Sequence, residues 1–187
     1  MIWDSSFWKD DLLILAQDLL RVTKRRKPSQ RLLVNLEKKV FLAGYTIRKL
    51  MEAGKLSSET EALPVPVVSY RNLGKAVTII NWHRLDGLYD FKSGRPISLP
   101  LRVVCNQIIH SYVFMPGGDS ATGPVNKIWF CSGRSRNRCL YELALSDLAE
   151  VLSVVGHDYP AQAVYVYDPA QKDYRVRAWT PGRRVRD

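Results

Sequence analysis

The chain has 187 residues, of which 46% are hydrophobic and 25% charged, so it is long and apolar enough to bury a core. No run approaches the roughly 18 to 20 apolar residues that cross a bilayer, and the first residues show no basic stretch followed by a long apolar one. We therefore expect a folded protein without a membrane-spanning or secretory segment. Lysine and arginine number 28 against 18 aspartate and glutamate, and this net charge of +10 favours polyanionic partners or simply solubility.

The content of cysteine, histidine and short motifs narrows the chemistry. Cys105, Cys131 and Cys139 form neither a CxxC pair nor an even-numbered disulfide framework, and three histidines are few for a zinc site. The sequence contains no GxSxG, P-loop, GxGxxG or HExxH motif, which argues against common hydrolases, kinases and dehydrogenases. We predict a reducing, cytoplasmic location, no metal and no cofactor.

The positive charge is concentrated in three segments. Residues 21–31 contain six basic residues and no acidic one, residues 134–138 contain three arginines, and residues 170–187 contain six basic residues against two acidic ones. Such segmental charge predicts basic patches, or a basic arm, on an otherwise ordinary domain. Basic loops and tails also serve solubility, so the charge alone leaves both interpretations open.

The first part of the chain predicts two amphipathic helices. From residue 4 to about 24, apolar residues recur every three or four positions, with Ser5 or Ser6 available as the N-cap. A second helix follows after a proline, capped by Ser29 and ended by Gly54. The short connection predicts an antiparallel helical hairpin with a basic turn at its tip, formed by Lys24, Arg25, Arg26 and Lys27.

The middle of the chain predicts a β-hairpin and a third helix. Residues 64–70 are extended, and their two prolines suit only an edge strand. Residues 75–82 are rich in β-branched side chains and predict a neighbouring strand. The third helix begins after Ser98 and stops before Met115. Residues 116–126, rich in Gly, Pro and Ser, predict the longest loop.

The last part of the chain predicts two strand pairs and a fourth helix. Residues 127–132 and 139–143 predict strands on either side of the basic loop, and Ser146 is expected to cap the helix that follows. Residues 163–167 and 174–179 alternate apolar and polar side chains, which predicts a second hairpin.

Together these elements predict the α+β class. A helical hairpin and a third and fourth helix would pack with antiparallel β-hairpins in a single compact domain. We place this domain at residues 1–180 and a basic flexible tail at residues 181–187. No internal repeat and no linker between two cores is evident.

Three polar residues of the third helix form a candidate catalytic set. Arg102, Asn106 and His110 are spaced by four, so a helix places them along one stripe beside its apolar face. A histidine exchanges a proton near neutral pH, an arginine holds a phosphate, and an asparagine orients either one. This set suits metal-independent cleavage of RNA, in which a base activates the 2′-hydroxyl. The alternative is structural: His110 bonds to a backbone carbonyl or to Tyr112, and Asn106 caps a neighbouring loop.

The same segment carries a family resemblance, confined to residues 102–112. Asn106-Gln107-Ile108-Ile109-His110-Ser111, a polar residue followed by apolar residues and a histidine, resembles the signature helix of HEPN proteins. Members of that superfamily are helical-bundle proteins, commonly dimeric, and many are metal-independent ribonucleases of bacterial toxin and antiviral systems. Others only bind RNA or a protein partner. The resemblance implies His110 as general acid or base, Asn106 as orienting group and Arg102 as phosphate ligand.

The loop between the strands of residues 127–132 and 139–143 is a candidate nucleic-acid contact. Arg134, Arg136 and Arg138 alternate with Ser135 and Asn137, which add hydrogen-bond donors for phosphate. We therefore predict binding of nucleic acid, RNA rather than DNA, by this loop and by the turn of residues 24–27. The alternative function is a non-catalytic nucleic-acid-binding or adaptor subunit that uses its basic loops and aromatic surface, with a protein partner or a second copy of itself. Trp3 and Phe7, near the start of the chain, are candidate protein contacts.

Overall fold

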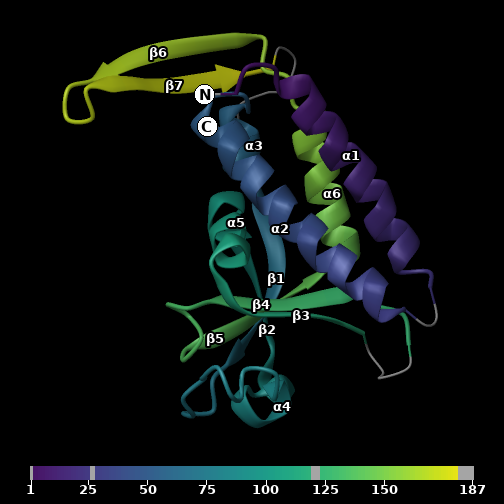
Figure 1. Cartoon of the computed structure of the whole chain (residues 1–187). Coiled ribbons are helices and arrows are strands. Elements are labelled where there is room, and N and C mark those ends of the chain that lie inside the picture. Colours follow the sequence, from purple (N-terminus) through teal and green to yellow (C-terminus); the bar gives the residue numbers. More distant parts are fainter. Residues whose placement is uncertain (1, 26–27, 119–122, 181–187) are drawn as a thin grey trace.

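The computed structural model describes residues 2–25, 28–118 and 123–180, and it confirms the predicted α+β class in one compact domain (Figure 1). The predicted tail at 181–187 lies outside the described residues. None of the described helices is both long and apolar enough to cross a membrane. The helical segments are α1 (Ser5–Val22), α2 (Gln30–Glu52), α3 (Ser58–Glu61), α4 (Leu85–Leu88), the 3-10 turn η1 (Phe91–Ser93), α5 (Leu101–Ile109) and α6 (Leu145–Gly156).

Five of the described strands form one sheet in the order β2-β1-β5-β4-β3, in which all neighbours are antiparallel. Two further strands form a separate antiparallel ribbon that projects from the body (Figure 1). The sheet contains β1 (Pro64–Arg71), β2 (Arg95–Pro100), β3 (Ser111–Gly117), β4 (Lys127–Ser132) and β5 (Cys139–Ala144), and the ribbon contains β6 (Gln162–Asp168) and β7 (Asp173–Trp179).

Helices cover one face of the sheet, and an irregular segment covers the other (Figure 1). Phe130 on β4 belongs to the hydrophobic core beneath the helices, whereas its neighbour Cys131 belongs to a second cluster. Because successive side chains of a strand point to opposite faces, the two clusters lie on the two sides of the sheet. Residues 72–94 close the second cluster with buried Leu88 and Tyr89. The middle of the sheet is therefore buried on both faces.

The two first helices run antiparallel from the basic turn, but each packs mainly on another helix. α1 packs chiefly on α6, and α2 packs on α5 and β3. Gly156 at the end of α6 permits the close approach of α1, since a Cβ there would lie 2.5 Å from the Cδ2 of Leu13. The predicted basic turn is exposed at Lys24 and Arg25, whereas Arg26 and Lys27 lie outside the described residues.

A buried lysine fastens α1 to two distant connections. The ammonium group of Lys9 donates to the carbonyl of Lys55 over 2.9 Å and to the carbonyl of Asp158, and it lies 4.1 Å from the centre of the Tyr159 ring. Burial lowers the pKa of Lys9, an effect that the nearby Asp158 opposes. The Asp158 carboxylate accepts a 2.6 Å hydrogen bond from the backbone of Ser57. Three segments far apart in the sequence thus meet at one polar cluster.

The N-cap of α2 is the residue predicted from the sequence, whereas the N-caps of α1 and α6 are not. Ser29 caps α2 as predicted, because its hydroxyl accepts from the Leu32 backbone. At α1 the cap is Asp4 rather than Ser5 or Ser6, and a carboxylate also suits the positive end of the helix dipole. At α6 the predicted cap Ser146 lies inside the helix. The first N–H of α6 is satisfied instead by the carbonyl of Asn126, over 2.8 Å.

β1 is not the edge strand that its prolines predicted. It pairs with β2 from Pro64 to Ser69 and with β5 from Val68 to Arg71. Pro64 and Pro66 lie in the half of β1 that has only β2 as a neighbour. Their missing N–H groups therefore remove no bond to β5.

Two further predictions in this region were wrong. Residues 75–78 are irregular and residues 79–82 form a turn rather than a strand, with Asn81 accepting from the Thr78 backbone over 2.7 Å and with Ile79 and Ile80 exposed. The place beside β1 is taken by β2, which the sequence had not predicted. The third helix ends at Ile109, because the residues from Ser111 onward pair with β4 as β3. The predicted loop at 116–126 thus begins after Gly117, and residues 119–122 within it lie outside the described residues.

Candidate nucleic-acid interface

The three residues predicted as a catalytic set lie on α5, but their side chains are not brought together. Arg102 is in the first turn and forms an ion pair with Glu61, 3.6 Å away. His110 is the exposed C-cap, and its backbone N–H donates to the carbonyl of Asn106. With a rise of about 1.5 Å per residue, Arg102 and His110 are separated by roughly 12 Å along the helix. No hydrogen bond or ion pair joins the side chains of these three described residues to one another.

The partner of Arg102 is a partly buried carboxyl. Burial raises the pKa of Glu61, and the nearby Arg102 guanidinium acts in the opposite direction. Arg102 therefore already serves a protein carboxylate that would otherwise be poorly solvated. A phosphate bound by Arg102 would have to compete with this ion pair.

The end of α5 is fixed to the β4–β5 loop of residues 133–138. The carbonyl of His110 accepts a 3.3 Å hydrogen bond from the backbone of Gly133, the first residue of that loop. Gln107 makes a second link, because its side-chain oxygen accepts from the Ser132 backbone over 2.8 Å and from the Ser135 hydroxyl over 2.6 Å. His110 and the basic loop, predicted separately, are thus neighbours, and Gln107 is a positioning residue that the sequence did not reveal.

Internal contacts hold the β4–β5 loop in one shape. The Arg136 carbonyl accepts from the hydroxyl of Tyr89 over 2.7 Å, and the Arg136 guanidinium stacks 3.9 Å above the centre of the Tyr112 ring. The Asn137 side chain accepts from the Val77 backbone over 2.8 Å. Ser135 is buried with its hydroxyl engaged. Ser135 and Asn137 therefore support the loop, although we predicted them as phosphate donors, and Arg134 stays exposed.

Arg138 joins two arginines from other strands in a pocket of about 480 Å³. Arg71 ends β1 opposite Cys139, and Arg95 begins β2 opposite Ser69, so the sheet register brings these side chains to the same end. No ion pair satisfies any of the three arginines within the described structure. We call this site the basic pocket, and it is lined by Ser69, Arg71, Asp90, Ser93, Arg95, Arg138 and Cys139.

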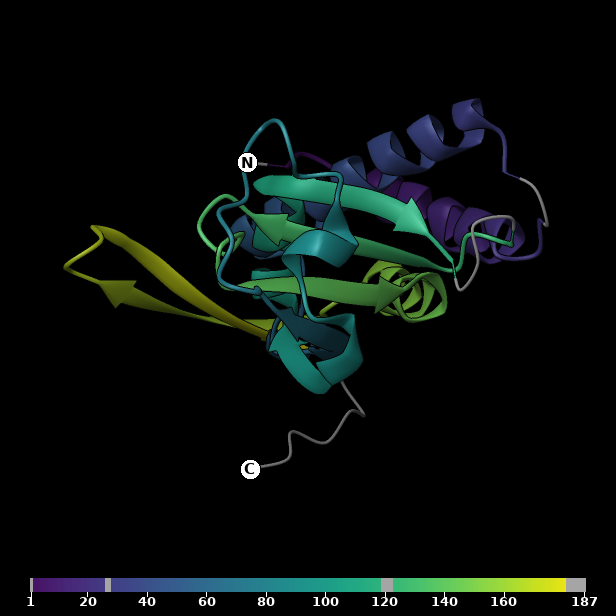
Figure 2. The same cartoon turned by 90° about the horizontal axis from the view of Figure 1, so that it is seen from below.

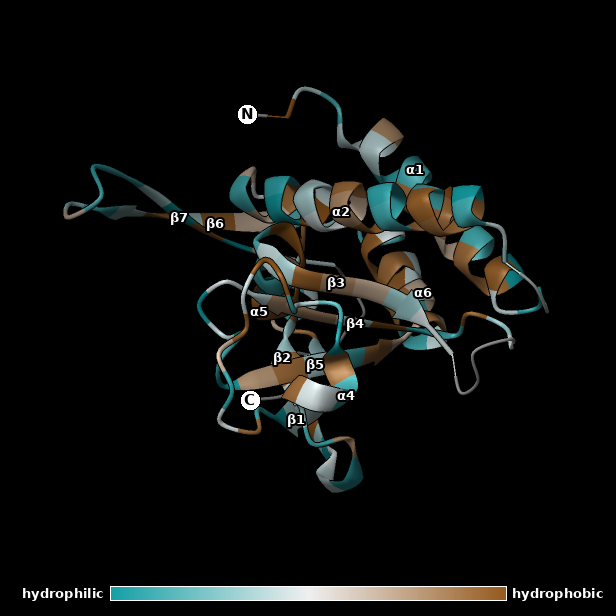
Figure 3. Cartoon of the chain, turned by 60° about the horizontal axis from the view of Figure 1, so that its bottom comes forward, coloured by the Kyte–Doolittle hydropathy of each residue, from teal (hydrophilic) through white to brown (hydrophobic). Residues whose placement is uncertain are grey.

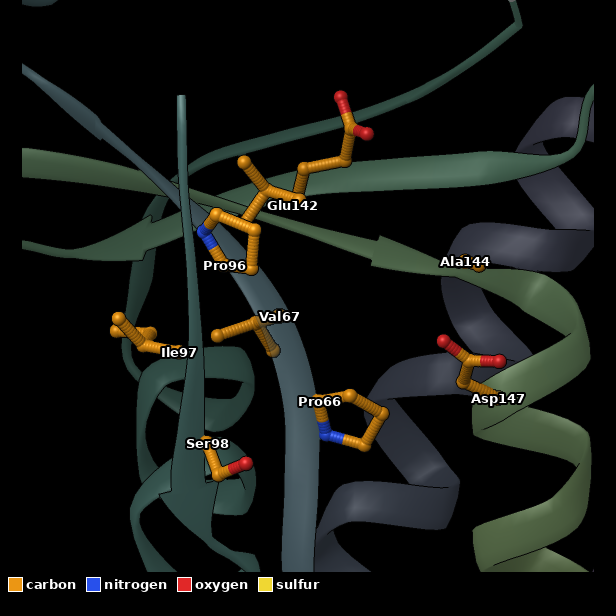
Figure 4. A pocket seen from close by; sticks show the side chains of 9 residues that line it. Pro66, Val67, Pro96, Ile97, Ser98, Glu142, Ala144 and Asp147 are labelled. Carbon is orange, nitrogen blue, oxygen red and sulfur yellow. The ribbon is translucent and has the colours of Figure 1, made fainter. Parts of the chain in front are cut away.

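A second pocket of about 480 Å³ has the opposite charge (Figure 4). Glu142 and Asp147 supply its charged groups, and no basic residue lines it. The Glu142 carboxylate accepts from the Tyr70 hydroxyl over 3.0 Å and from the Trp129 indole over 2.7 Å. Burial and this bond raise the pKa of Tyr70 to about 12. The Glu142 carboxylate also pairs with Lys127 over 3.4 Å, so the negative charge of this pocket is partly neutralised, whereas three arginines line the basic pocket.

The two basic regions predicted from the sequence do not form one surface. The α1–α2 turn and the β4–β5 loop lie at opposite sides of the molecule in Figures 1 and 2. Lys24 and Arg25 are exposed at the turn, and neither lines the basic pocket. Each region would therefore contact a separate part of a long ligand.

Comparison with known proteins identifies no family for this chain. No protein-family model, no curated protein and no solved structure matches the chain. The HEPN-like resemblance therefore stays a prediction. Among the described residues, no group of three or more His, Cys, Asp or Glu side chains is gathered to hold a metal ion.

Proposed function

We propose that the protein binds RNA through the basic pocket and the adjoining β4–β5 loop. The observation that carries the proposal is the convergence of Arg71, Arg95 and Arg138, which come from three separate segments and form no ion pair within the described structure. The Asp90 carboxylate also lines the pocket, so its three arginines outnumber its acidic groups. Guanidinium groups hold phosphate oxygens in pairs of parallel hydrogen bonds. A loop whose backbone and polar side chains are already bonded loses little entropy when it binds.

The chemistry of the pocket favours backbone contact over base reading. Arginines at a sheet end bind phosphates of any sequence and position the strand without reading it. Three such contacts predict that log Kd changes with log salt concentration by a slope of about 2 for a single strand. Involvement of Arg134 and of the α1–α2 turn would raise this slope.

A second part of the proposal is metal-independent cleavage of RNA at His110, as in HEPN-like ribonucleases of bacterial defence or toxin systems. His110 supports it by its exposure and by its bond to the root of the basic loop. Because Glu61 engages Arg102, the loop arginines are the nearer source of positive charge for a developing phosphorane. Asn106 would orient the histidine from the preceding turn of α5.

Binding is tested by titrating labelled single-stranded RNA, single-stranded DNA and duplex DNA at several salt concentrations. We expect Arg71→Ala, Arg95→Ala and Arg138→Ala each to weaken RNA binding by about tenfold and to lower the salt slope by about 0.7. Lys38→Ala removes an exposed basic residue of α2 that lies outside both basic regions, so it is the control and should change affinity little. Equal losses in all four variants would show that net charge, not the pocket, binds RNA.

Cleavage is read in the same samples with EDTA present. Metal-independent cutting that disappears in His110→Ala, with binding retained, is the expected result of the catalytic part. RNA that stays intact at every protein concentration would remove that part and leave a binding subunit. A chain that binds none of the three nucleic acids would contradict the whole proposal and point to a protein partner.

A further inference from the structure

The β6–β7 ribbon has two chemically different faces. Its register places Tyr165 opposite Val176 and Tyr167 opposite Tyr174, so these side chains share one face. The other face pairs valines with arginines, as at Val164 and its partner on β7. We call the first the aromatic face, and it consists of Ala163, Tyr165, Tyr167, Tyr174, Val176 and Ala178, none of which is charged.

The aromatic face is covered at its root and bare beyond it. Ala178 is buried, and its N–H donates to the Ser58 hydroxyl over 3.3 Å. The methyl groups of Val176 lie 3.7 Å from the position that a Cβ would take at Gly54. Further out, Tyr165, Tyr167 and Tyr174 are 65%, 52% and 58% exposed. A two-stranded hairpin is marginally stable by itself, so the outer ribbon lacks the layer that normally covers such a face.

The chemistry of this face selects protein over nucleic acid. Rings that stack on bases in single-strand binding sites are accompanied by cations that hold the phosphates. Here the arginines of β7 point to the other face, and Arg175 is bonded to Asp168 over 2.6 Å. Tyrosines on an uncharged apolar face are instead typical of protein interfaces.

The body of the same chain offers an uncovered apolar groove. It lies between α1 and α2, has a volume of about 430 Å³, and is covered by no other part of the described chain. Phe7, Ile14 and Leu42 on its walls are 71%, 59% and 64% exposed. Figure 3 shows hydrophobic stretches along α1, α2 and the β6–β7 ribbon. Isolated exposed apolar residues are common, but several such residues around one groove mark a binding surface.

We propose that two copies of the chain exchange their ribbons, so that the aromatic face of each ribbon lies in the α1–α2 groove of the other copy. The ribbon projects away from the groove of its own chain (Figure 1), so a second copy must supply the contact. One charge pair is complementary: Asp11 on the groove wall and Lys172 in the turn at the tip of the ribbon have opposite charges, and neither forms an ion pair in the described structure. This interaction does not depend on the RNA-binding proposal.

The available area favours a reciprocal exchange over a single contact. At roughly 150–250 Å² for a whole tyrosine, the exposed parts of the three tyrosines bury about 350 Å² on one ribbon. With a similar area in the groove, one contact buries about 700 Å², below the roughly 1,200 Å² of stable interfaces. Two equivalent contacts reach about 1,400 Å² and satisfy the twofold symmetry common to dimers.

The test is the mass of the purified chain in solution, measured by sedimentation velocity from about 1 to 100 μM. We expect a concentration-dependent dimer that is lost in a ribbon variant, Tyr165→Ser with Tyr167→Ser, and in a groove variant, Phe7→Ser with Leu42→Ser. The control is Ile79→Ser with Ile80→Ser, which removes equally exposed apolar groups elsewhere and should leave the dimer intact. Circular dichroism verifies that each variant is folded, since all six side chains are exposed.

Mixing the variants gives the sharper result. The ribbon variant keeps its groove and the groove variant keeps its ribbon, so the mixture should form a weak heterodimer although each variant alone is monomeric. A wild-type chain that stays monomeric at 100 μM, or a dimer that both variants retain, would overturn the proposal. A ribbon variant that remains a dimer but binds RNA more weakly would also overturn the proposal, because the aromatic face would then be a nucleic-acid surface.

Discussion

Two hairpins of similar length show how differently the molecule treats the same local structure. β4 and β5 are buried between neighbouring strands, and Phe130, Cys131 and Leu140 have no exposed surface. β6 and β7 pair only with each other, and Tyr165 is 65% exposed. Both segments alternate as strands do, so the difference comes from what packs around them.

The covered and the uncovered hairpin suit different kinds of binding site. A hairpin that is covered on both faces becomes a rigid frame, and its loop presents arginines in a fixed position. A hairpin without covering layers keeps its side chains available to a partner and depends on that partner for its own order. The first arrangement suits a ligand-binding site, and the second suits an assembly contact.

The largest difference in the free energy of unfolding is expected between two ring truncations, one in each hairpin. Phe130→Ala removes a fully buried ring between the helices and the sheet and should lower the free energy of unfolding by about 3–5 kcal/mol. Tyr165→Ala in the ribbon should cost less than about 1 kcal/mol. Urea denaturation at submicromolar protein, where copies do not associate, measures both. Equal losses would mean that the ribbon is part of the cooperative core.

An intermediate effect is expected at the link between α5 and the basic loop. Gln107→Ala leaves the Ser132 N–H and the Ser135 hydroxyl without their acceptor and should cost about 1–3 kcal/mol. RNA affinity should also fall, because the loop loses its fixed shape. Gln17→Ala, an exposed glutamine on α1, serves as the control in both assays. A loss of stability without a loss of affinity would show that the rigidity of the loop is irrelevant to binding.

The smallest effect is expected on the stability of the β6–β7 ribbon at acidic pH. The hydrogen bond from Arg175 is the main reason that the pKa of Asp168 lies below its usual range. The folded ribbon therefore gains stability from this carboxylate above its unfolded pKa, and loses that stability as the pH falls through the lowered value. The Ala170 N–H and the Arg175 Nε–H donate to the Asp168 carboxylate, so their NMR shifts should move over this range and stay constant in Asp168→Asn. Gln171→Ala is the control expected to behave like wild type.

Local patterns in the sequence were enough for most helices, for the β4–β5 pair and for the β6–β7 ribbon, whereas the predicted hairpin of residues 64–70 and 75–82 was wrong. The stripes of α1, α2 and α6 and the alternation around Asp168 were confirmed because amphipathic periodicity reports which face is buried. Strands β2 and β3 were missed because they follow or precede α5 without a turn signal. The run at residues 75–82 was overestimated, since β-branched residues form strands only where an edge is free to pair.

The site was predictable only in part. Arg134, Arg136 and Arg138 were found from local charge, but their roles differ: Arg136 stacks on Tyr112, whereas Arg138 lines the pocket. Arg71 and Arg95 gave no local signal, because their proximity depends on the register of β1 with its neighbours. Residues joined by register rather than by spacing cannot be found without the topology.

The contact of α1 with α6 also determines when the first helix can fold during synthesis. Lys9 and its acceptor on Asp158 are 149 residues apart. A ribosome adding roughly 5 to 20 residues per second needs on the order of ten seconds to span that distance. During this interval the apolar stripe of α1 has no α6 to cover it. The nascent chain therefore completes its first helix layer only after nearly all of its domain has emerged.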